Sequence, residues 1–239
     1  MLKLSYDLHI HSCLSPCGDD DMLPSNIVGM AALMELDVIA VTDHNSCKNC
    51  PAVMKLAEDY GVLAIPGMEI CTSEEVHVIC LFPDLQKAML FDNYVSSLIL
   101  KTPNNEDIFG KQEIYDENDN IIGNEHYLLI NAVNINFDNL YHIITQYGGI
   151  MIPAHIDKAS NSLISNLGFI PPESKFKCVE IKNIEKKDNM ISQHNYLKNC
   201  NIITNSDAHY LGDINEPINF LYAENKSIQD VLTALITNK

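Results

Sequence analysis

The chain carries an alternating stretch near its N-terminus, from Leu2 to His11 (LKLSYDLHIH). Its even positions are apolar and its odd positions are polar, which is the period of a β-strand with one buried face. His9 and His11 therefore point to the same side, with Cα atoms roughly 6.5–7 Å apart at about 3.3 Å per residue. Two imidazoles placed in this way can bind one metal ion or two adjacent ions.

The length of 239 residues and the apolar fraction of 46% are sufficient for a large α/β domain with a real core. The sequence has no run of about 18 apolar residues, and no basic segment followed by an apolar one at its N-terminus, so we expect neither a membrane span nor a signal peptide. The eight cysteines are scattered, which is typical of reduced thiols. We therefore expect a cytoplasmic protein with no membrane partner.

The net charge is −17, and all 15 basic residues are lysine. The chain therefore lacks the guanidinium fork that usually binds phosphate, and we expect no broad basic surface for nucleic acid. The lysines gather between Lys175 and Lys198, where Glu180, Glu185 and Asp188 interrupt them. From this charge we expect a small phosphorylated substrate, and we do not expect an extended nucleic acid as a partner.

Predicted strands and helices alternate along the chain, which favours an α/β fold with a parallel sheet. The strands are expected at residues 2–11, 37–44, 62–69, 76–82, 149–155, 177–183, 201–207 and 219–223. The helices are expected at residues 24–36, 51–60, 83–100, 137–147, 186–199 and 227–237, with a short one at 126–132. Residues 101–136 are less regular, with a hairpin at 113–123. We interpret them as an insertion in a single domain of residues 1–239.

Metal-binding side chains recur where the predicted strands end. They are His9, His11, His44, Glu69, His155, Asp207 and His209, and His77 stands near the start of its strand. In parallel α/β barrels the C-terminal ends of the strands converge on one face. Imidazoles mixed with carboxylates are typical ligands of Zn, Mn or Fe. Eight ligands are too many for one ion, so we expect two or three divalent transition metal ions.

These residues lie in short motifs that resemble, in order and spacing, those of the PHP (polymerase and histidinol phosphatase) superfamily. The motifs are His9-Ile10-His11, Thr42-Asp43-His44, Pro66-Gly67-Met68-Glu69-Ile70, Val76-His77, Pro153-Ala154-His155 and Ser206-Asp207-Ala208-His209. The resemblance runs from residue 6 to about residue 213. It implies a distorted seven-stranded (β/α) barrel with a trinuclear metal centre that hydrolyses phosphoesters. It also implies that the ligands are His9, His11, His44, Glu69, His77, His155, Asp207 and His209.

Relatives often carry one more ligand, an Asp or a His, in the loop after the first motif. Here the loop contains Ser15-Pro16-Cys17-Gly18 followed by Asp19, Asp20 and Asp21. Asp19 is our choice, with Asp20 as its close alternative. Cys17 is a further alternative because a thiolate binds Zn well.

The resemblance predicts a metal-dependent phosphoesterase that hydrolyses a small phosphomonoester or nucleotide with a metal-activated hydroxide. Asp207, or a second water molecule, is expected to pass a proton to the leaving group. Lys158 follows His155 by three residues, where relatives often have a basic residue, and is expected to contact the phosphate. The alternatives are an exonuclease-type hydrolase acting on nucleic-acid ends, a metal-binding module that has lost catalysis, and an amidohydrolase. The native metal, the leaving group and the oligomeric state stay open.

Three other features favour structural roles. Cys47 and Cys50 form a CxxC pair with no second pair to complete a zinc site, so we interpret them as thiols in a loop. Asp43, beside His44, is interpreted as a carboxylate that supports the ligands. Outside the motifs lie His126, His142 and His194, for which we expect surface or packing roles.

Overall fold

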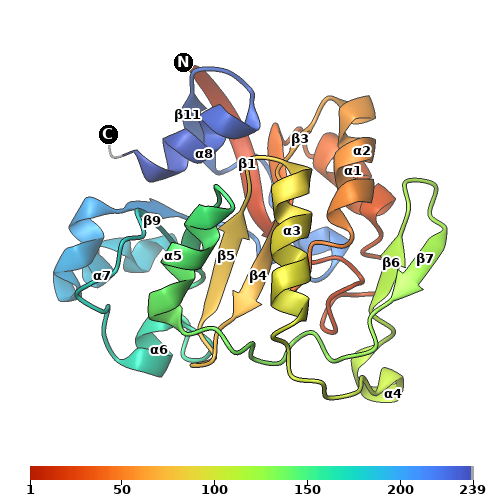
Figure 1. Ribbon diagram of the computed structural model, residues 1–239. Coiled ribbons are helices and arrows are strands. Elements are labelled where there is room, and N and C mark those ends of the chain that lie inside the picture. The colour runs from red at the N-terminus through yellow and green to blue at the C-terminus, as the bar shows by residue number, and fades with distance from the viewer. Residues whose placement is uncertain (238–239) are drawn as a thin grey trace.

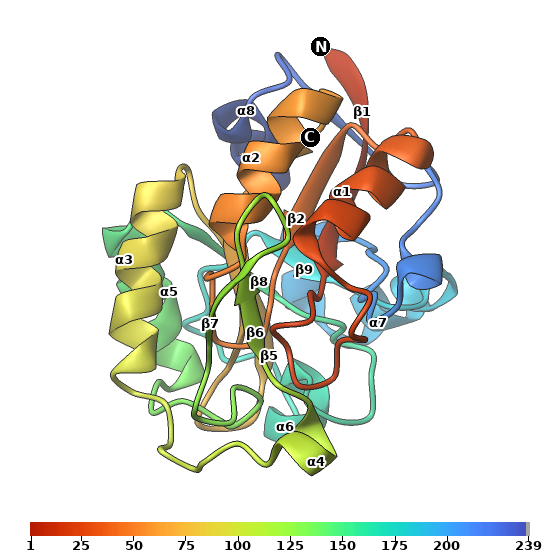
Figure 2. The same ribbon diagram turned by 90° about the vertical axis from the view of Figure 1, so that its right-hand side faces the viewer.

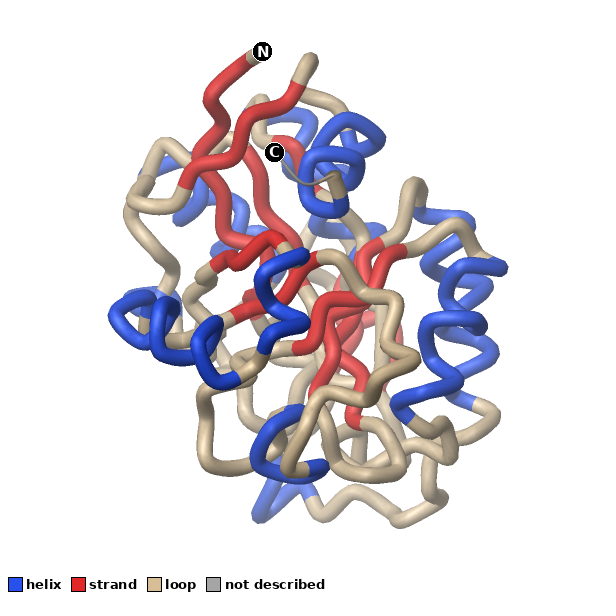
Figure 3. The backbone as a smooth tube through the Cα atoms, turned by 90° about the vertical axis from the view of Figure 1, so that its left-hand side faces the viewer, coloured by secondary structure: helices blue, strands red, loops and turns tan. Residues whose placement is uncertain are grey.

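The computed structural model describes residues 1–237, and its strands lie between helices (Figures 1 and 3). One sheet has the order β11-β1-β2-β3, from β1 (Leu2–Ile10), β2 (Val38–Val41), β3 (Leu63–Ala64) and β11 (Phe220–Ala223). A second has the order β4-β5-β8, from β4 (Gly67–Cys71), β5 (His77–Leu81) and β8 (Ile150–Pro153). Two pairs complete the set, β9 (Cys178–Glu180) with β10 (Asn201–Ile203), and β6 (Glu113–Tyr115) with β7 (Ile121–Asn124).

The helices cover the outer faces of these sheets. They are α1 (Pro24–Leu33), α2 (Cys50–Tyr60), α3 (Leu85–Ser96), α4 (Glu106–Phe109), α5 (Phe137–Gln146), α6 (Leu163–Leu167), α7 (Lys187–Gln193) and α8 (Ile228–Ile236). Apolar residues of α3 and α5 pack with those of β4 and β5 in one core cluster (Figure 1). A second cluster joins α1 and α2 to β1 and β2, and a third joins α8 to β1 and β11. None of the helices within residues 1–237 has the length and hydrophobicity that a membrane crossing requires.

The α/β prediction is correct, whereas the parallel arrangement holds only for part of the structure. Parallel pairs join β1 to β2, β2 to β3 and β9 to β10. However, β5 runs antiparallel to both β4 and β8, and β11 runs antiparallel to β1. Within residues 1–237 no sheet closes on itself, so the predicted seven-stranded barrel is not confirmed.

The predicted strand 62–69 passes from one sheet to the other. Its first part, β3, pairs with β2, and its second part, β4, pairs with β5. Pro66 lies between them and has no N–H group for a ladder hydrogen bond. Gly67 follows, where a Cβ atom would lie 2.7 Å from the carbonyl oxygen of Cys80. This crossing brings the end of β2 beside β4, where His44 and Glu69 form an isolated parallel bridge.

The irregular region between α3 and α5 contains the predicted hairpin, β6–β7, which forms a sheet of its own, to the right of the main sheets in Figure 1 and in front of them in Figure 2. The prediction of a helix at residues 126–132 is wrong, since this segment has no helical residues in the structure. The buried side chain of Gln112 donates to the carbonyl oxygens of Glu125 and Tyr127 and accepts from the N–H group of Leu129. These hydrogen bonds hold the segment in an irregular path, because they replace bonds that a helix would make internally.

The crossing at Gly67 predicts a clear difference between two glycine substitutions. Gly67→Ala should lower the free energy of unfolding by about 1–3 kcal/mol, because the added methyl group meets backbone. A methyl group on Gly29 in α1 would meet nothing within 4 Å beyond its own helix, so Gly29→Ala should raise stability by roughly 0.5–1 kcal/mol. Urea unfolding with chelator present measures both changes. Equal stability of the two variants would contradict the packing argument.

Candidate metal centre

The carboxylate of Glu69 lies at the centre of the candidate site. Imidazole nitrogens lie 3.1–3.5 Å from its two oxygens, on His9, His11, His44, His77 and His155. Glu69 is only 1% exposed. Burial alone would raise its pKa, but the nearby imidazoles, chiefly those of His77 and His9, hold the pKa well below its usual range. Glu69 is therefore an ionised carboxylate in a buried ring of histidines.

Strand geometry accounts for the positions of these side chains. The pleat of β1 places His9 and His11 on one face, as predicted, and their Nε2 atoms lie 3.2 Å apart. His77 opens β5, which runs antiparallel to β4, and it pairs with Cys71 at the end of β4. The start of β5 therefore lies at the same edge as the end of β4. This reversal explains why a residue at the start of its strand joins residues at the ends of others.

Asp207 brings a second carboxylate to the same edge. Its Oδ1 atom lies 3.5 Å from the Nε2 atoms of both His9 and His11, and its Oδ2 atom accepts a 2.7 Å hydrogen bond from Lys158. Burial would raise the pKa of Asp207, but His9 and His11 hold it well below its usual range. The ring of His209 stacks on that of His11 with centroids 4.4 Å apart. Thus Asp207, His209 and Lys158 all reach the site.

Two residues of the site have unusual backbone conformations. His155 has a φ angle of 31° and Asp207 has one of 53°. Non-glycine residues avoid this left-handed region at a cost of about 1–3 kcal/mol. Packing and hydrogen bonds around these two residues must therefore offset this cost. Strained backbone conformations of this kind are common at functional sites.

The loop after β1 brings Cys17, and not Asp19, to the imidazoles. The Asp19 carboxylate accepts from the N–H group of Asp21, and Asp20 is exposed. The Sγ atom of Cys17 instead lies in a group with one nitrogen each of His11, His44 and His209, all within 4.8 Å of one another. Within residues 1–237, Asp19 belongs to none of the ligand groups, whereas its alternative, Cys17, belongs to one.

Glu180 also belongs to the candidate site, and the sequence reasoning missed it because it counted this residue only among the acidic residues that interrupt the lysines. It ends β9, is only 1% exposed, and accepts a 2.9 Å hydrogen bond from Nδ1 of His9 and a 2.7 Å one from Asn205. Its other oxygen accepts from the backbone N–H group of His155. Because Nδ1 of His9 donates to Glu180, Nε2 keeps its lone pair toward the site. An acidic residue ending an apolar strand, as at Glu69, was the available signal.

Asp43 supports His11 in a similar way, as expected. It accepts hydrogen bonds of 2.7 and 2.6 Å from the backbone and hydroxyl of Ser12, and one of 2.7 Å from the hydroxyl of Ser15. The Ser15 oxygen, which donates to Asp43, lies 3.0 Å from Nδ1 of His11 and accepts from it. His11 therefore also directs Nε2 toward the centre.

Several buried polar atoms at the centre lack hydrogen-bond partners within residues 1–237. They are Nδ1 of His44, Oε2 of Glu69, Nε2 of His77 and Nδ1 of His155. Buried polar atoms without partners are uncommon and costly. Two further groups of possible ligands surround them, His9-His11-Glu69 and His44-Glu69-His77. Imidazole and carboxylate donors that converge in this way fit divalent transition metal ions.

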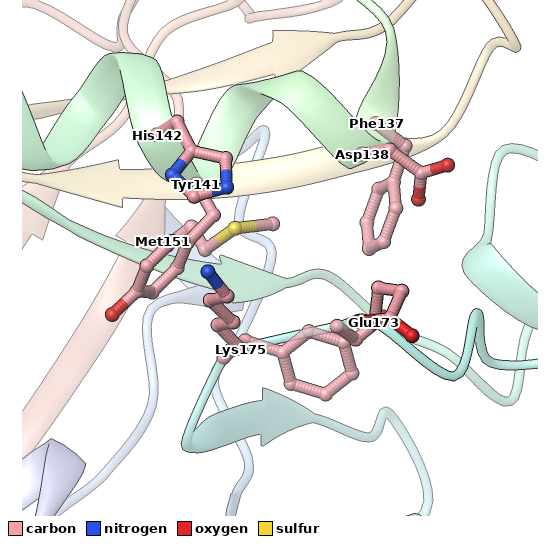
Figure 4. Close-up of a pocket in the computed structure, with 9 residues that line it drawn as sticks. Phe137, Asp138, Tyr141, His142, Met151, Glu173 and Lys175 are labelled. Atoms are coloured by element: carbon pink, nitrogen blue, oxygen red, sulfur yellow. The ribbon is translucent and has the colours of Figure 1, made fainter.

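The remaining candidates lie elsewhere. All eight cysteines fall within residues 1–237 and are free thiols, and those of Cys47 and Cys50 both donate to the carbonyl oxygen of Gly67. His142 lines a separate cavity of about 140 Å³ on α5, with Tyr141, Met151 and Lys175 (Figure 4). His126 and His194 take no part in the ligand groups found within the described residues.

Comparison with known families matches the PHP domain model to residues 7–236. The chain therefore belongs to the PHP domain family. Members of this family that resemble it are metal-dependent hydrolases, which agrees with the ligand groups described above.

Two curated relatives match part of the chain. An uncharacterized protein of Methanocaldococcus jannaschii is 34% identical over 92 residues, which cover 35% of this chain and 54% of that protein. The 5′-3′ exoribonuclease Rnm of Salmonella typhimurium is 32% identical over 92 residues, covering 36% of this chain and 30% of that protein. The matches thus span about half or less of these relatives.

Solved structures share the fold over nearly the whole chain. Endonuclease Q of Pyrococcus furiosus, a lesion-specific endonuclease, is 17% identical with a TM-score of 0.70, covering 98% of this chain and 56% of that one. A protein of Bifidobacterium adolescentis described as a metal-dependent phosphoesterase is 15% identical with a TM-score of 0.59, covering 96% of this chain and 95% of that one.

The expectation that an extended nucleic acid is not a partner, which was based on net charge, is wrong. A second structure of endonuclease Q, 18% identical with a TM-score of 0.66 and covering 98% of this chain and 56% of that one, holds a 27-mer duplex substrate with an abasic lesion at its active site. The same fold thus accommodates long nucleic acids. Net charge sums over the entire surface, whereas a substrate meets only the side chains around the site.

The contact between Glu180 and His9 predicts an effect on metal affinity. Glu180→Gln keeps the shape but weakens the bond that orients His9, so affinity for Zn²⁺ should fall about 10- to 100-fold. Competition with a chromophoric chelator measures it. Glu185→Gln, at an exposed neighbouring position, is the matched control and should change nothing. Equal affinities of the two variants would show that Glu180 does not act through His9.

Proposed function

We propose that this chain is a metal-dependent phosphoester hydrolase. The ligands are His9, His11, His44, Glu69, His77, His155, Asp207 and His209. The supporting observation is the buried Glu69 carboxylate among five imidazoles, several with unpaired atoms. Two or three ions of Zn, Mn or Fe in this centre would supply a nucleophilic water at neutral pH and neutralise charge on the phosphate.

Lys158 and Asp207 have complementary roles in this proposal. The Lys158 side chain is 40% exposed, and its ammonium group donates to Oδ2 of Asp207. Burial would lower the pKa of Lys158, but Asp207 raises it, so the group stays cationic. An ammonium group has three N–H donors, which leaves two for a phosphate oxygen at the mouth of the site. In this proposal Asp207, which contacts this ammonium group and the histidines, assists proton transfer to the leaving group.

Two more lysines contact the residues that precede Asp207 and Lys158 in sequence, which favours a substrate with more than one phosphate. Lys182 donates from its ammonium group to the carbonyl oxygen of Ser206, the residue before Asp207. The ammonium group of Lys186 lies 3.4 Å from the carboxylate of Asp157, the residue before Lys158. The end of a nucleic-acid strand is therefore a second candidate substrate, beside the small phosphomonoester or nucleotide. The exoribonuclease and endonuclease among the similar proteins support it.

Metal content tests the proposed function directly. Protein purified without chelator should contain at least two equivalents of transition metal per chain, and chelation should abolish phosphoester hydrolysis. His9→Ala should lose metal and activity, because it removes a ligand contact of both Glu69 and Asp207. His142→Ala, on the exposed side of α5, should retain both. Less than one equivalent after reloading with Zn²⁺, Mn²⁺ or Fe²⁺ would overturn the multinuclear centre.

Variants of Lys158 and Lys182 should affect kcat/KM differently for the two substrate classes. Lys158→Ala should lower kcat/KM roughly 10- to 150-fold for a small phosphomonoester and for a single-stranded oligonucleotide, with metal content unchanged. Lys182→Ala should lower kcat/KM for the oligonucleotide alone, and reduce its log–log salt slope by about 0.7. Lys55→Ala, at an exposed position on α2, is the control.

The opposite results are equally informative. If neither lysine variant changes any rate, these lysines are surface residues. If Lys182→Ala slows both substrates equally, its contact with Ser206 serves only to hold Asp207 in place.

A further inference from the structure

The loop between β1 and α1 holds Cys17 in a fixed position beside the metal centre. Gly18 donates to the carbonyl oxygen of Ser15 at 2.9 Å, and a Cβ atom on Gly18 would lie 2.2 Å from the carbonyl oxygen of Ser12. The turn therefore requires glycine after Cys17. The N–H group of Asp19 donates to the carbonyl oxygen of His209 at 2.9 Å. This bond ties the Cys17 loop directly to the segment that carries His209.

The imidazoles beside Cys17 also face the carboxylates of the centre. Nε2 of His11 lies 3.2 Å from Nε2 of His9 and 3.5 Å from oxygens of Glu69 and Asp207, while its Nδ1 donates to Ser15. His11 therefore contacts two carboxylates as well as belonging to the group around Cys17. Two further imidazoles lie in the Cys17 group.

Those two imidazoles are His44 and His209. His44 is 3% exposed, and its Nδ1 has no hydrogen-bond partner within residues 1–237. His209 is half-buried and reaches the same group through a loop that Asp19 holds. Nδ1 of His44 also lies 3.1 Å from Oε2 of Glu69, and Nδ1 of His209 lies 3.9 Å from Oδ1 of Asp207, so each ring faces one carboxylate as well as the Cys17 sulfur.

We propose that the Cys17 thiolate, with His44 and His209, forms one metal position of the centre. The proposal deepens the function proposed above and rests on the same metal centre. The thiol proton is released to solvent when the metal–sulfur bond forms. A ligand set of one thiolate and two imidazoles favours Zn²⁺ and Co²⁺ over Mn²⁺ and Mg²⁺, for which oxygen donors are preferred. Three protein ligands also leave a coordination position open, as in catalytic zinc sites.

Cobalt titration tests the proposal without any measurement of activity. Metal-free protein titrated with Co²⁺ should develop a near-ultraviolet charge-transfer band, which requires a cobalt–sulfur bond. Cys17→Ser should lose the band and one equivalent of bound cobalt. Cys13→Ser is the matched control in the same loop, because Cys13 is half-buried but outside the ligand group, and it should keep both.

The Cys17→Asp variant distinguishes loss of the sulfur ligand from disruption of the loop conformation. This variant should lack the band but keep full metal stoichiometry, with its preference shifted toward Mn²⁺ because a carboxylate replaces the thiolate. A cobalt-loaded wild-type protein without the band, or a band that survives in Cys17→Ser, would overturn the thiolate proposal and leave the phosphoesterase proposal intact. A chain that binds no metal at all would overturn both.

Discussion

The charge of the Glu69 carboxylate is the constraint on which the site depends. A buried anion is tolerated only where nearby charge and hydrogen bonds compensate for lost hydration. In the chain alone this compensation comes from imidazoles. Burial would lower the pKa of His77, but Glu69 raises it to about 10. His9 behaves likewise, since Glu180, Glu69 and Asp207 raise its pKa well above its usual value despite burial. If these histidines are neutral, the negative charge of Glu69 is compensated only when cations bind among them.

Much of this arrangement is readable from the sequence, because a strand's period and direction place its side chains. The pleat of β1 predicts that His9 and His11 share a face, and strand ends predict His44 and Glu69. Glu180 was missed although it also ends an apolar strand, because it was grouped with the nearby lysines, while its hydrogen-bond partners His9, Asn205 and His155 are distant in sequence. The direction of β5 was equally hidden, because a strand's own residues do not specify which neighbour it joins.

Loops depend on distant hydrogen bonds that local composition does not reveal. Local composition favours Asp19 as the loop ligand, whereas in the structure Cys17 lies in a group with three imidazoles and the backbone N–H of Asp19 donates to His209. The helix expected at 126–132 is replaced because the Gln112 side chain binds its backbone. The same lesson applies to charge. A total of −17 obscures Lys158, Lys182 and Lys186, which contact Asp207, Ser206 and Asp157 respectively.

The site is also assembled from the two ends of the described chain. The N–H group of Leu8 donates to the side chain of Asn205, 197 positions away, and His9 lies against Asp207. Contacts between such distant segments form only after most of the loop-closure entropy between them has been lost. The ligands around Glu69 therefore come together only in the folded chain, whereas the unfolded chain offers only the local His9-x-His11 pair. Tight metal uptake is in this sense a signal that folding is complete.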